Sequence, residues 1–262
     1  GRDLIFPHHE NEIAQSEALT GKTFADYWSH CGLIKINGEK MSKSLGNSLT
    51  IRDALKMYNY EVLKFVMFSK HYSSDIDILD NDYTLAESQM YYFYNTIKAM
   101  EDFINQYNGD AVGEKLEDDI SSKIKEDFIN VMDDDFNTPA AIANLHAIFK
   151  YANGILKAVM KDTRQKTANT LKAILDEVKD AYKVIGFFTQ EPEKFSSELK
   201  FKYLNKLGIE ENEILSKIEE RKEAKKNKDY ETADKIRSEL DEKGIILNDT
   251  VNGTVWDVKA LS

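Results

Sequence analysis

The segment Lys40–Ser44 has the residue types that most directly suggest chemistry in this sequence. Lys40 and Lys43 stand three positions apart, with the hydroxyl groups of Ser42 and Ser44 between and after them. Ammonium groups at such a spacing can stabilise the negative charge that develops on a phosphoryl group in transfer. The spacing of a Walker loop is absent. The segment therefore predicts a phosphate-binding loop of another kind, and the alternative is a solvated lysine–serine loop.

A second candidate site is the pair His8 and Glu12, which stand four residues apart in a stretch, 8–19, that predicts a helix. Residues at this spacing lie on one face of a helix and can reach a common ion. Zinc accepts nitrogen and oxygen ligands of these two types. The alternative is an exposed pair that only stabilises the first helical turn. The neighbours His9 and Glu10 point elsewhere, and we assign them no metal.

A local basic cluster stands out because the whole chain is acidic, with a formal net charge of -11. That charge argues against general nucleic-acid binding, which favours a basic surface. The cluster consists of Arg221, Lys222, Lys225, Lys226 and Lys228. The spacing 221, 225 and 228 places three cations on one helical face, where they could contact phosphates without reading sequence. The interleaved glutamates leave open the alternative of a solvated, salt-bridged face.

The composition indicates which elements position these residues. With 262 residues the chain suggests about two or three domains, and 42% apolar residues suffice for a sizeable core. The chain has only 3 prolines and 12 glycines, and so few turn-forming residues favour a mostly helical chain over a turn-rich β-sandwich. No apolar run approaches the roughly 18 residues that span a bilayer. A single cysteine, Cys31, excludes an internal disulfide framework and fits a reducing cytosol, so we expect a cytoplasmic protein without a membrane.

Hydrophobic periodicity and turn residues predict the order of elements. After the first helix we expect a helical turn over 24–30, a strand over 32–36, a hairpin at Asn37–Gly38 and the polar loop 39–48. The remaining helices are predicted at 51–57 with Thr50 as cap, then at 62–71, 82–107, 116–132, 138–161, 164–187, 194–206, 211–227 and 229–244. Strands at 245–247 and 254–258 flank a second turn at Asn252–Gly253. The four long helices predict an antiparallel bundle.

Several of these motifs resemble one protein family. Lys40–Ser44 is identical to the KMSKS signature of class I aminoacyl-tRNA synthetases, and it follows a strand and hairpin as that loop does. Within that class, cysteinyl-tRNA synthetases are the members that the chain resembles. The resemblance is carried by residues 3–16, 27–32, 132–139, 228–237, 244–245 and 253–256, and it is weakest over 140–220.

The resemblance implies a mostly α fold with a remnant of an α/β, Rossmann-like nucleotide-binding domain. An antiparallel helical bundle and a small C-terminal α+β domain would follow. The domains implied are a catalytic remnant with the KMSKS loop over 1–48, a helical connective domain over 49–80, a tRNA-binding bundle over 81–190 and an anticodon-binding domain over 191–262. In that family, two cysteine zinc ligands and a HIGH motif precede the His-His-Glu run. We therefore expect this chain to be the C-terminal part of such a synthetase and to be inactive by itself.

The resemblance also implies an activity: cysteine is activated by ATP with Mg²⁺ to the adenylate and is then transferred to tRNA(Cys). The catalytic residues implied are Lys43 and Lys40. The implied ATP-binding residues are Lys40, Met41, Ser42, Lys43, Ser44, Asp3 and His30. His8 and Glu12 would be two of four zinc ligands. One Zn²⁺ is therefore expected in each full-length chain, whereas the site in the present chain is expected to be incomplete. The basic cluster would contact tRNA(Cys), a monomer is expected, and Cys31 is expected to be a small packed residue.

Three alternatives to this interpretation differ in what they do. The chain could be a helical tRNA-binding module without catalysis. A ligase that joins cysteine to an amino sugar would share much of the site, but it needs no long bundle or C-terminal domain. A methionyl relative would share the KMSKS loop but not the run from His8 to Glu12.

Overall fold

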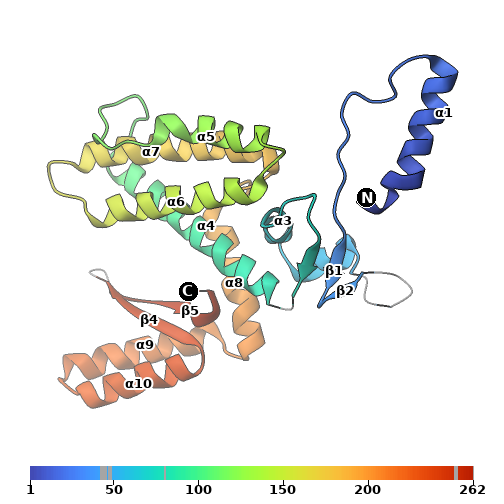
Figure 1. Ribbon diagram of the computed structural model, residues 1–262. Coiled ribbons are helices and arrows are strands. Elements are labelled where there is room, and N and C mark those ends of the chain that lie inside the picture. Colours follow the sequence, from blue (N-terminus) through green and yellow to red (C-terminus); the bar gives the residue numbers. More distant parts are fainter. Residues whose placement is uncertain (42–45, 47–48, 80, 251–252, 262) are drawn as a thin grey trace. The chain divides into compact units, whose positions relative to one another are not determined.

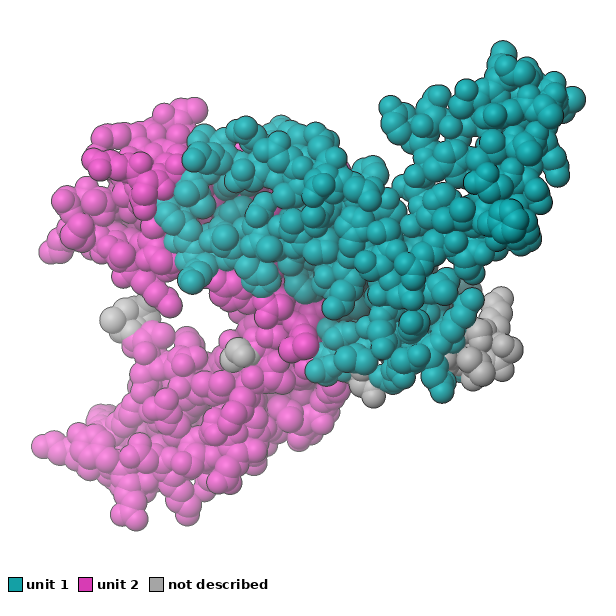
Figure 2. Space-filling model, viewed as in Figure 1, with its two compact units in different colours: residues 1–83, 120–151 teal, residues 84–119, 152–262 magenta. Residues whose placement is uncertain are grey.

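The computed structural model describes residues 1–41, 46, 49–79, 81–250 and 253–261 of the chain. Helices dominate these residues, and the strands form two small sheets (Figure 1). The chain divides into two compact units, coloured separately in Figure 2. Unit 1 comprises Gly1–Tyr83 and Ile120–Tyr151, and unit 2 comprises Thr84–Asp119 and Ala152–Ser262. The predicted mostly α fold class with small sheets is confirmed, whereas the four domain boundaries remain predictions.

Unit 1 combines short elements with two longer helices. Its elements are α1 (Glu10–Thr20), β1 (Ile34–Ile36), β2 (Glu39–Lys40), α2 (Ile51–Met57), α3 (Tyr60–Phe68), β3 (Ile76–Ile78), α5 (Ser121–Asp133) and the greater part of α6 (Thr138–Lys157). Local chemistry explains where α2 begins, because the Thr50 hydroxyl accepts a hydrogen bond from the Asp53 backbone N–H at 3.1 Å. Asn59 caps α3 in the same way through the Glu61 N–H. The predicted helix over 51–57 is confirmed at both ends.

The sheet of unit 1 has the order β2–β1–β3. β1 and β2 pair antiparallel across the predicted Asn37–Gly38 turn, so that hairpin is confirmed. β3 pairs parallel with β1, with Ile34 opposite Ile76 and Ile36 opposite Ile78. The sequence analysis missed β3, although Ile76 and Ile78 alternate with aspartates. Ile76, Ile78 and the α3 residues Val62, Phe65 and Val66 are buried.

The expected helical turn over 24–30 was wrong. These residues form no regular element. The Phe24 N–H donates to Glu17 at 3.1 Å, and the Phe24 ring lies 5.8 Å from that of Trp28. Contacts with α1, which local spacing does not reveal, replace the helical hydrogen bonds here.

Unit 2 contains most of α4 (Asp82–Gln106), the end of α6, α7 (Arg164–Tyr182), α8 (Pro192–Leu207), α9 (Glu211–Lys226), α10 (Tyr230–Glu242), β4 (Ile245–Thr250) and β5 (Gly253–Val258). Its core is aromatic: Phe93, Tyr94 and Phe195 are each at most 1% exposed, and the rings of Tyr94 and Phe195 stack at 4.0 Å. Three of the four residues in the aromatic run 91–94 of α4 are buried in this core.

The last part of unit 2 places the β4–β5 hairpin on helices α9 and α10 (Figure 1). The strands pair antiparallel from Ile245 with Val258 to Thr250 with Gly253, as predicted, while residues 251 and 252 of the turn lie outside the described residues. Arg221 of α9 is 3% exposed and binds both carboxylate oxygens of Asp249 on β4, at 2.8 and 3.0 Å. Lys225 binds the same carboxylate at 2.8 Å. These ion pairs with Asp249 join α9 to the β4–β5 hairpin.

We expect Asp249→Asn to remove part of the acid sensitivity of this region. Arg221, followed by Lys225 and Thr254, holds the pKa of the Asp249 carboxyl well below its usual range. A carboxyl with a lowered folded-state pKa stabilises the fold above its unfolded pKa of about 3.9, and that stabilisation is lost as the pH falls. At neutral pH Asp249→Asn should lower the free energy of unfolding by at least about 1 kcal/mol, because the buried Arg221 guanidinium then keeps only neutral acceptors among the described residues.

Urea unfolding between pH 3 and pH 7 measures this effect, with Trp256 as the only tryptophan in a Trp28→Phe background. The variant should depend less on pH than its parent below about pH 5. Asp241→Asn, which breaks a surface pair with Lys259, is the matched control. Equal pH dependence in Asp249→Asn and its parent would contradict the assignment.

Candidate active site

The first residues of the chain lie against the sheet of unit 1. The Arg2 backbone N–H donates to the Cys31 carbonyl oxygen at 3.0 Å. The Arg2 guanidinium binds the Asp75 carboxylate at 2.7 Å. These contacts bring residues 1–3 beside the strands although more than 25 residues separate them in sequence.

Asp75 connects this N-terminal segment to the start of β1. Its carboxylate accepts a hydrogen bond from the Leu33 N–H at 3.0 Å and pairs with Lys35 at 3.2 Å, in addition to Arg2. The Leu33 backbone N–H, together with Lys35, lowers the pKa of the Asp75 carboxyl. Asp75 is therefore an ionised anchor for two cations and a backbone amide. Sequence reasoning missed it because its partners lie far away along the chain.

The fold brings Asp3 next to Lys40, two of the residues predicted to act on ATP. The Lys40 ammonium lies 3.8 Å from the Asp3 carboxylate, and both side chains are substantially exposed, at 61% and 44%. A carboxylate accepts hydrogen bonds from a diol, and an ammonium group attracts phosphate oxygens. The two groups thus offer complementary contacts at one place on the surface.

The β1–β2 hairpin determines where the predicted phosphate-binding loop begins. Asn37 and Gly38 both have positive φ, and the Gly38 N–H donates to the Asp77 carboxylate at 2.9 Å. The Met41 N–H donates to the Ile34 carbonyl at 3.1 Å, which extends the hairpin to the first residues of the KMSKS segment. Ser42, Lys43 and Ser44 lie outside the described residues, so their predicted roles remain predictions.

His30, another predicted ATP-binding residue, contacts His9, which immediately precedes α1. Nε2 of His30 lies 3.0 Å from Nδ1 of His9, and the two rings stack at 5.0 Å. The Trp28 ring is nearly parallel to that of His30 at 5.9 Å. His9, to which we had assigned no metal, therefore helps to orient His30.

His8 and Glu12 are both exposed, at the turn that precedes α1 and in its first turn. An imidazole and a carboxylate fit zinc by donor type. Within the described residues, no group of three or more histidine, cysteine or acidic side chains gathers as a metal site. The pair can therefore be part of a zinc site, and its role remains a prediction. Cys31 is exposed, so its interpretation as a packed residue was wrong.

The residues of the basic cluster of α9 differ in their burial and in their partners. Arg221 is buried against Asp249, which excludes it as an exposed phosphate ligand and corrects that assignment. Lys225 binds the same carboxylate. Lys222 and Lys226 pair with glutamates one turn away, at 2.9 and 3.5 Å, and Lys228 is exposed after the helix. The salt-bridged alternative therefore describes much of this face, and tRNA contacts by the exposed lysines remain a prediction.

Comparison with known proteins gives two family matches. Residues 1–88 match the family of class I (C) tRNA synthetase catalytic domains, and residues 127–189 match the DALR domain family. The chain is 41% identical over 266 residues to the cysteine–tRNA ligase of Geobacter metallireducens, covering 99% of this chain and 53% of that protein. It is 43% identical over 266 residues to the corresponding ligase of Thermodesulfovibrio yellowstonii, with the same shares covered.

Along nearly all of its length the chain is thus similar to cysteine–tRNA ligases. It spans about half the length of the curated relatives that it matches. The catalytic-domain match contains Asp3, His30 and Lys40, whose contacts are described above. Helices long and apolar enough to cross a membrane do not occur in the described part of the chain.

Proposed function

We propose that this chain forms part of a cysteine–tRNA ligase, which activates cysteine with ATP and transfers it to tRNA(Cys). The observation that carries the proposal is the 41% identity to such a ligase along 99% of the chain. In the first step the cysteine carboxylate attacks the α-phosphorus of ATP, which forms cysteinyl-adenylate and releases pyrophosphate. In the second step a terminal ribose hydroxyl of the tRNA takes the cysteinyl group, and AMP leaves.

The residues of this chain would act by positioning and electrostatics. Asp3 would accept hydrogen bonds from the ribose hydroxyls of ATP. Lys40, which lies 3.8 Å from Asp3, would meet the phosphate charge when nucleotide replaces this ion pair. Lys43 would stabilise the transferring phosphoryl group, with Met41, Ser42 and Ser44 lining the loop. His30, oriented by His9, would approach the nucleotide.

We further propose that His8 and Glu12 supply two zinc ligands, with Mg²⁺ accompanying ATP as substrate. Zinc with an open position binds the thiolate of cysteine and so discriminates against serine. The imidazole nitrogen of His8 and the carboxylate of Glu12 fit such a site by donor type and by their exposure. The exposed Lys222, Lys226 and Lys228 would contribute phosphate contacts to tRNA.

Cysteine-dependent ATP–pyrophosphate exchange by the complete protein that carries this chain tests the proposal, with zinc quantified on the same sample. We expect exchange and about one zinc per chain, with a deficit in His8→Ala, because removing one of four ligands weakens binding. Absence of exchange, together with salt-sensitive binding of tRNA, would instead support a non-catalytic tRNA-binding module. Unchanged zinc content in His8→Ala would overturn the assignment of that ligand.

A further inference from the structure

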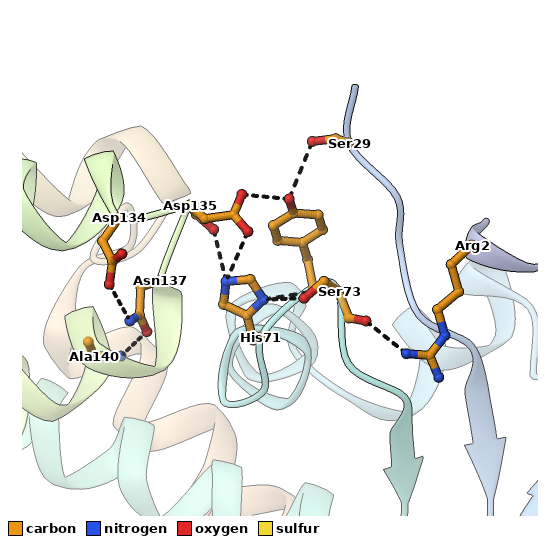
Figure 3. A network of polar contacts seen from close by, with 9 residues as sticks. Arg2, Ser29, His71, Ser73, Asp134, Asp135, Asn137 and Ala140 are labelled. Atoms are coloured by element: carbon orange, nitrogen blue, oxygen red, sulfur yellow. Dashed lines mark hydrogen bonds and ion pairs between the residues drawn. The ribbon is translucent and has the colours of Figure 1, made fainter. Parts of the chain in front are cut away.

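A polar network in unit 1 joins the loop between α5 and α6 to the segment that contains His30 (Figure 3). The Tyr72 hydroxyl donates to the Asp135 carboxylate at 2.7 Å. His71 contacts the Asp135 carbonyl oxygen through Nε2 at 2.9 Å and the Ser73 hydroxyl through Nδ1 at 2.7 Å. Asp135 belongs to the part of the chain that matches the DALR domain family, whereas Tyr72 belongs to the catalytic-domain match.

Backbone contacts hold Asp135 in an unusual conformation. Asp135 and Phe136 have φ values of 52° and 55°, a left-handed conformation that residues other than glycine adopt at a cost. The Phe136 N–H donates to the Met132 carbonyl at 2.9 Å, and the Asn137 N–H donates to the Val131 carbonyl at 3.0 Å. Asn137 then caps α6 through the Ala140 N–H at 3.2 Å. The loop is thus fastened at both ends, and strain of this kind often accompanies function.

The other end of the network reaches the residues next to His30. The Tyr72 carbonyl accepts from the Gly32 N–H at 2.9 Å, and the Ser29 hydroxyl lies 3.5 Å from the Tyr72 hydroxyl. Gly32 fits closely against the Ser74 carbonyl, where a Cβ would clash with the backbone. A displacement of Tyr72 would therefore move residues on both sides of His30.

We propose that Asp135 is a positioning residue for the adenylation site: through Tyr72 it holds the segment 29–32, and with it His30, in place. This inference rests on the proposed function, since His30 matters only if nucleotide binds beside it. Asp135 itself would touch neither ATP nor cysteine. The link would connect the DALR-matched part of the chain with the catalytic part inside one compact unit.

A tryptophan beside the segment reports directly on its position. Trp28 precedes Ser29 and stacks on His30, and a Trp256→Phe background leaves it as the only tryptophan. We expect Asp135→Gly, which tolerates the left-handed backbone, to raise acrylamide quenching of Trp28 and to shift its emission to the red. Tyr72→Phe should do the same with no change of backbone. Neither change should unfold the chain, because the Asp135 side chain is 64% exposed and Tyr72→Phe removes only a hydroxyl group.

Two further variants make the test specific. Asp134→Gly removes the neighbouring carboxylate, which contacts Asn137 and not Tyr72, and should leave Trp28 unchanged. Asp135→Asn keeps an oxygen acceptor and tolerates positive φ, so it should restore most of the parent behaviour. The proposal would be overturned if Trp28 were quenched equally in Asp135→Gly, Tyr72→Phe and Asp134→Gly. It would also be overturned if Asp135→Asn did not return the quenching to the level of the parent.

The same variants in the complete protein test the consequence for adenylation. We expect Asp135→Gly and Tyr72→Phe to lower the kcat of ATP–pyrophosphate exchange about tenfold, with Asp134→Gly within about twofold of the parent, since small displacements of a positioning group slow a reaction strongly. Unchanged kcat in the first two variants would overturn the positioning role. If the parent shows no exchange, the proposed function fails, whereas the Trp28 measurement still decides whether Asp135 holds the segment.

Discussion

Lys43→Ala in the complete protein is expected to lower cysteine-dependent ATP–pyrophosphate exchange by about 10²–10³-fold, the effect typical of losing a group that stabilises transition-state charge. Lys43 is the second lysine of the KMSKS segment, which follows the β1–β2 hairpin. Its ammonium group would meet the charge that grows on the α-phosphate as pyrophosphate leaves. The loss should appear mainly in kcat, because that charge develops only in the transition state.

Zinc content and a second lysine variant serve as controls for this expectation. Zinc should be unchanged in Lys43→Ala, because the proposed ligands His8 and Glu12 lie elsewhere in the sequence. Lys56→Ala removes an exposed lysine of α2 that pairs only with Asp53 among the ion pairs described, and exchange should stay within about twofold of the parent. Normal exchange in Lys43→Ala would remove Lys43 from the active site.

The second large effect concerns stability: Lys202→Met should lower the free energy of unfolding of unit 2 by about 3 kcal/mol. Glu87 of α4 is 1% exposed, and its carboxylate pairs with Lys202 of α8 and accepts from the Tyr203 hydroxyl at 2.8 Å. Without Lys202, the buried carboxylate keeps only the Tyr203 hydroxyl as partner among the residues that the structure describes. An uncompensated buried charge costs far more than a surface pair contributes.

Urea unfolding followed by Trp256 emission, in the Trp28→Phe background, measures this change. Lys194→Met on the same helix is the matched control, because it breaks an exposed pair with Glu198 that should contribute only about 0.3–0.5 kcal/mol. Adding Glu87→Gln to Lys202→Met should recover much of the stability, since a neutral amide still accepts from Tyr203. If the double variant is no more stable than Lys202→Met alone, the loss does not come from the buried charge.

Features that depend on neighbours in sequence were predicted well. Thr50 caps α2, and Asn37–Gly38 turns the first hairpin. Each of these depends on a side chain or a backbone conformation within a few residues, so the sequence contains the whole cause.

Features that depend on distant partners were missed or misjudged. β3 has three residues, and its pairing with β1 depends on a parallel neighbour about 40 residues away. The residues at 24–30 have helical spacing, but the Trp28 ring packs against Phe24 and against His9, the residue before α1. Arg221 stands among solvated lysines in sequence, yet Asp249, 28 residues later, takes its guanidinium into the interior.

The sequence by itself indicated the resemblance to cysteinyl-tRNA synthetases, the mostly α class, the helix caps and the candidates for phosphate and zinc chemistry, because those follow from residue type and short spacing. Only the tertiary structure decided that Asp3 lies beside Lys40, that Asp75 joins Arg2 to β1, and that Asp135 reaches the His30 segment through Tyr72. These pairs are separated by 37 to 73 residues in the chain, and no local periodicity encodes which distant groups meet. The physical cause is packing. Strands and helices bury their apolar faces against each other, and this packing determines which polar groups at their ends lie close enough to form hydrogen bonds and ion pairs.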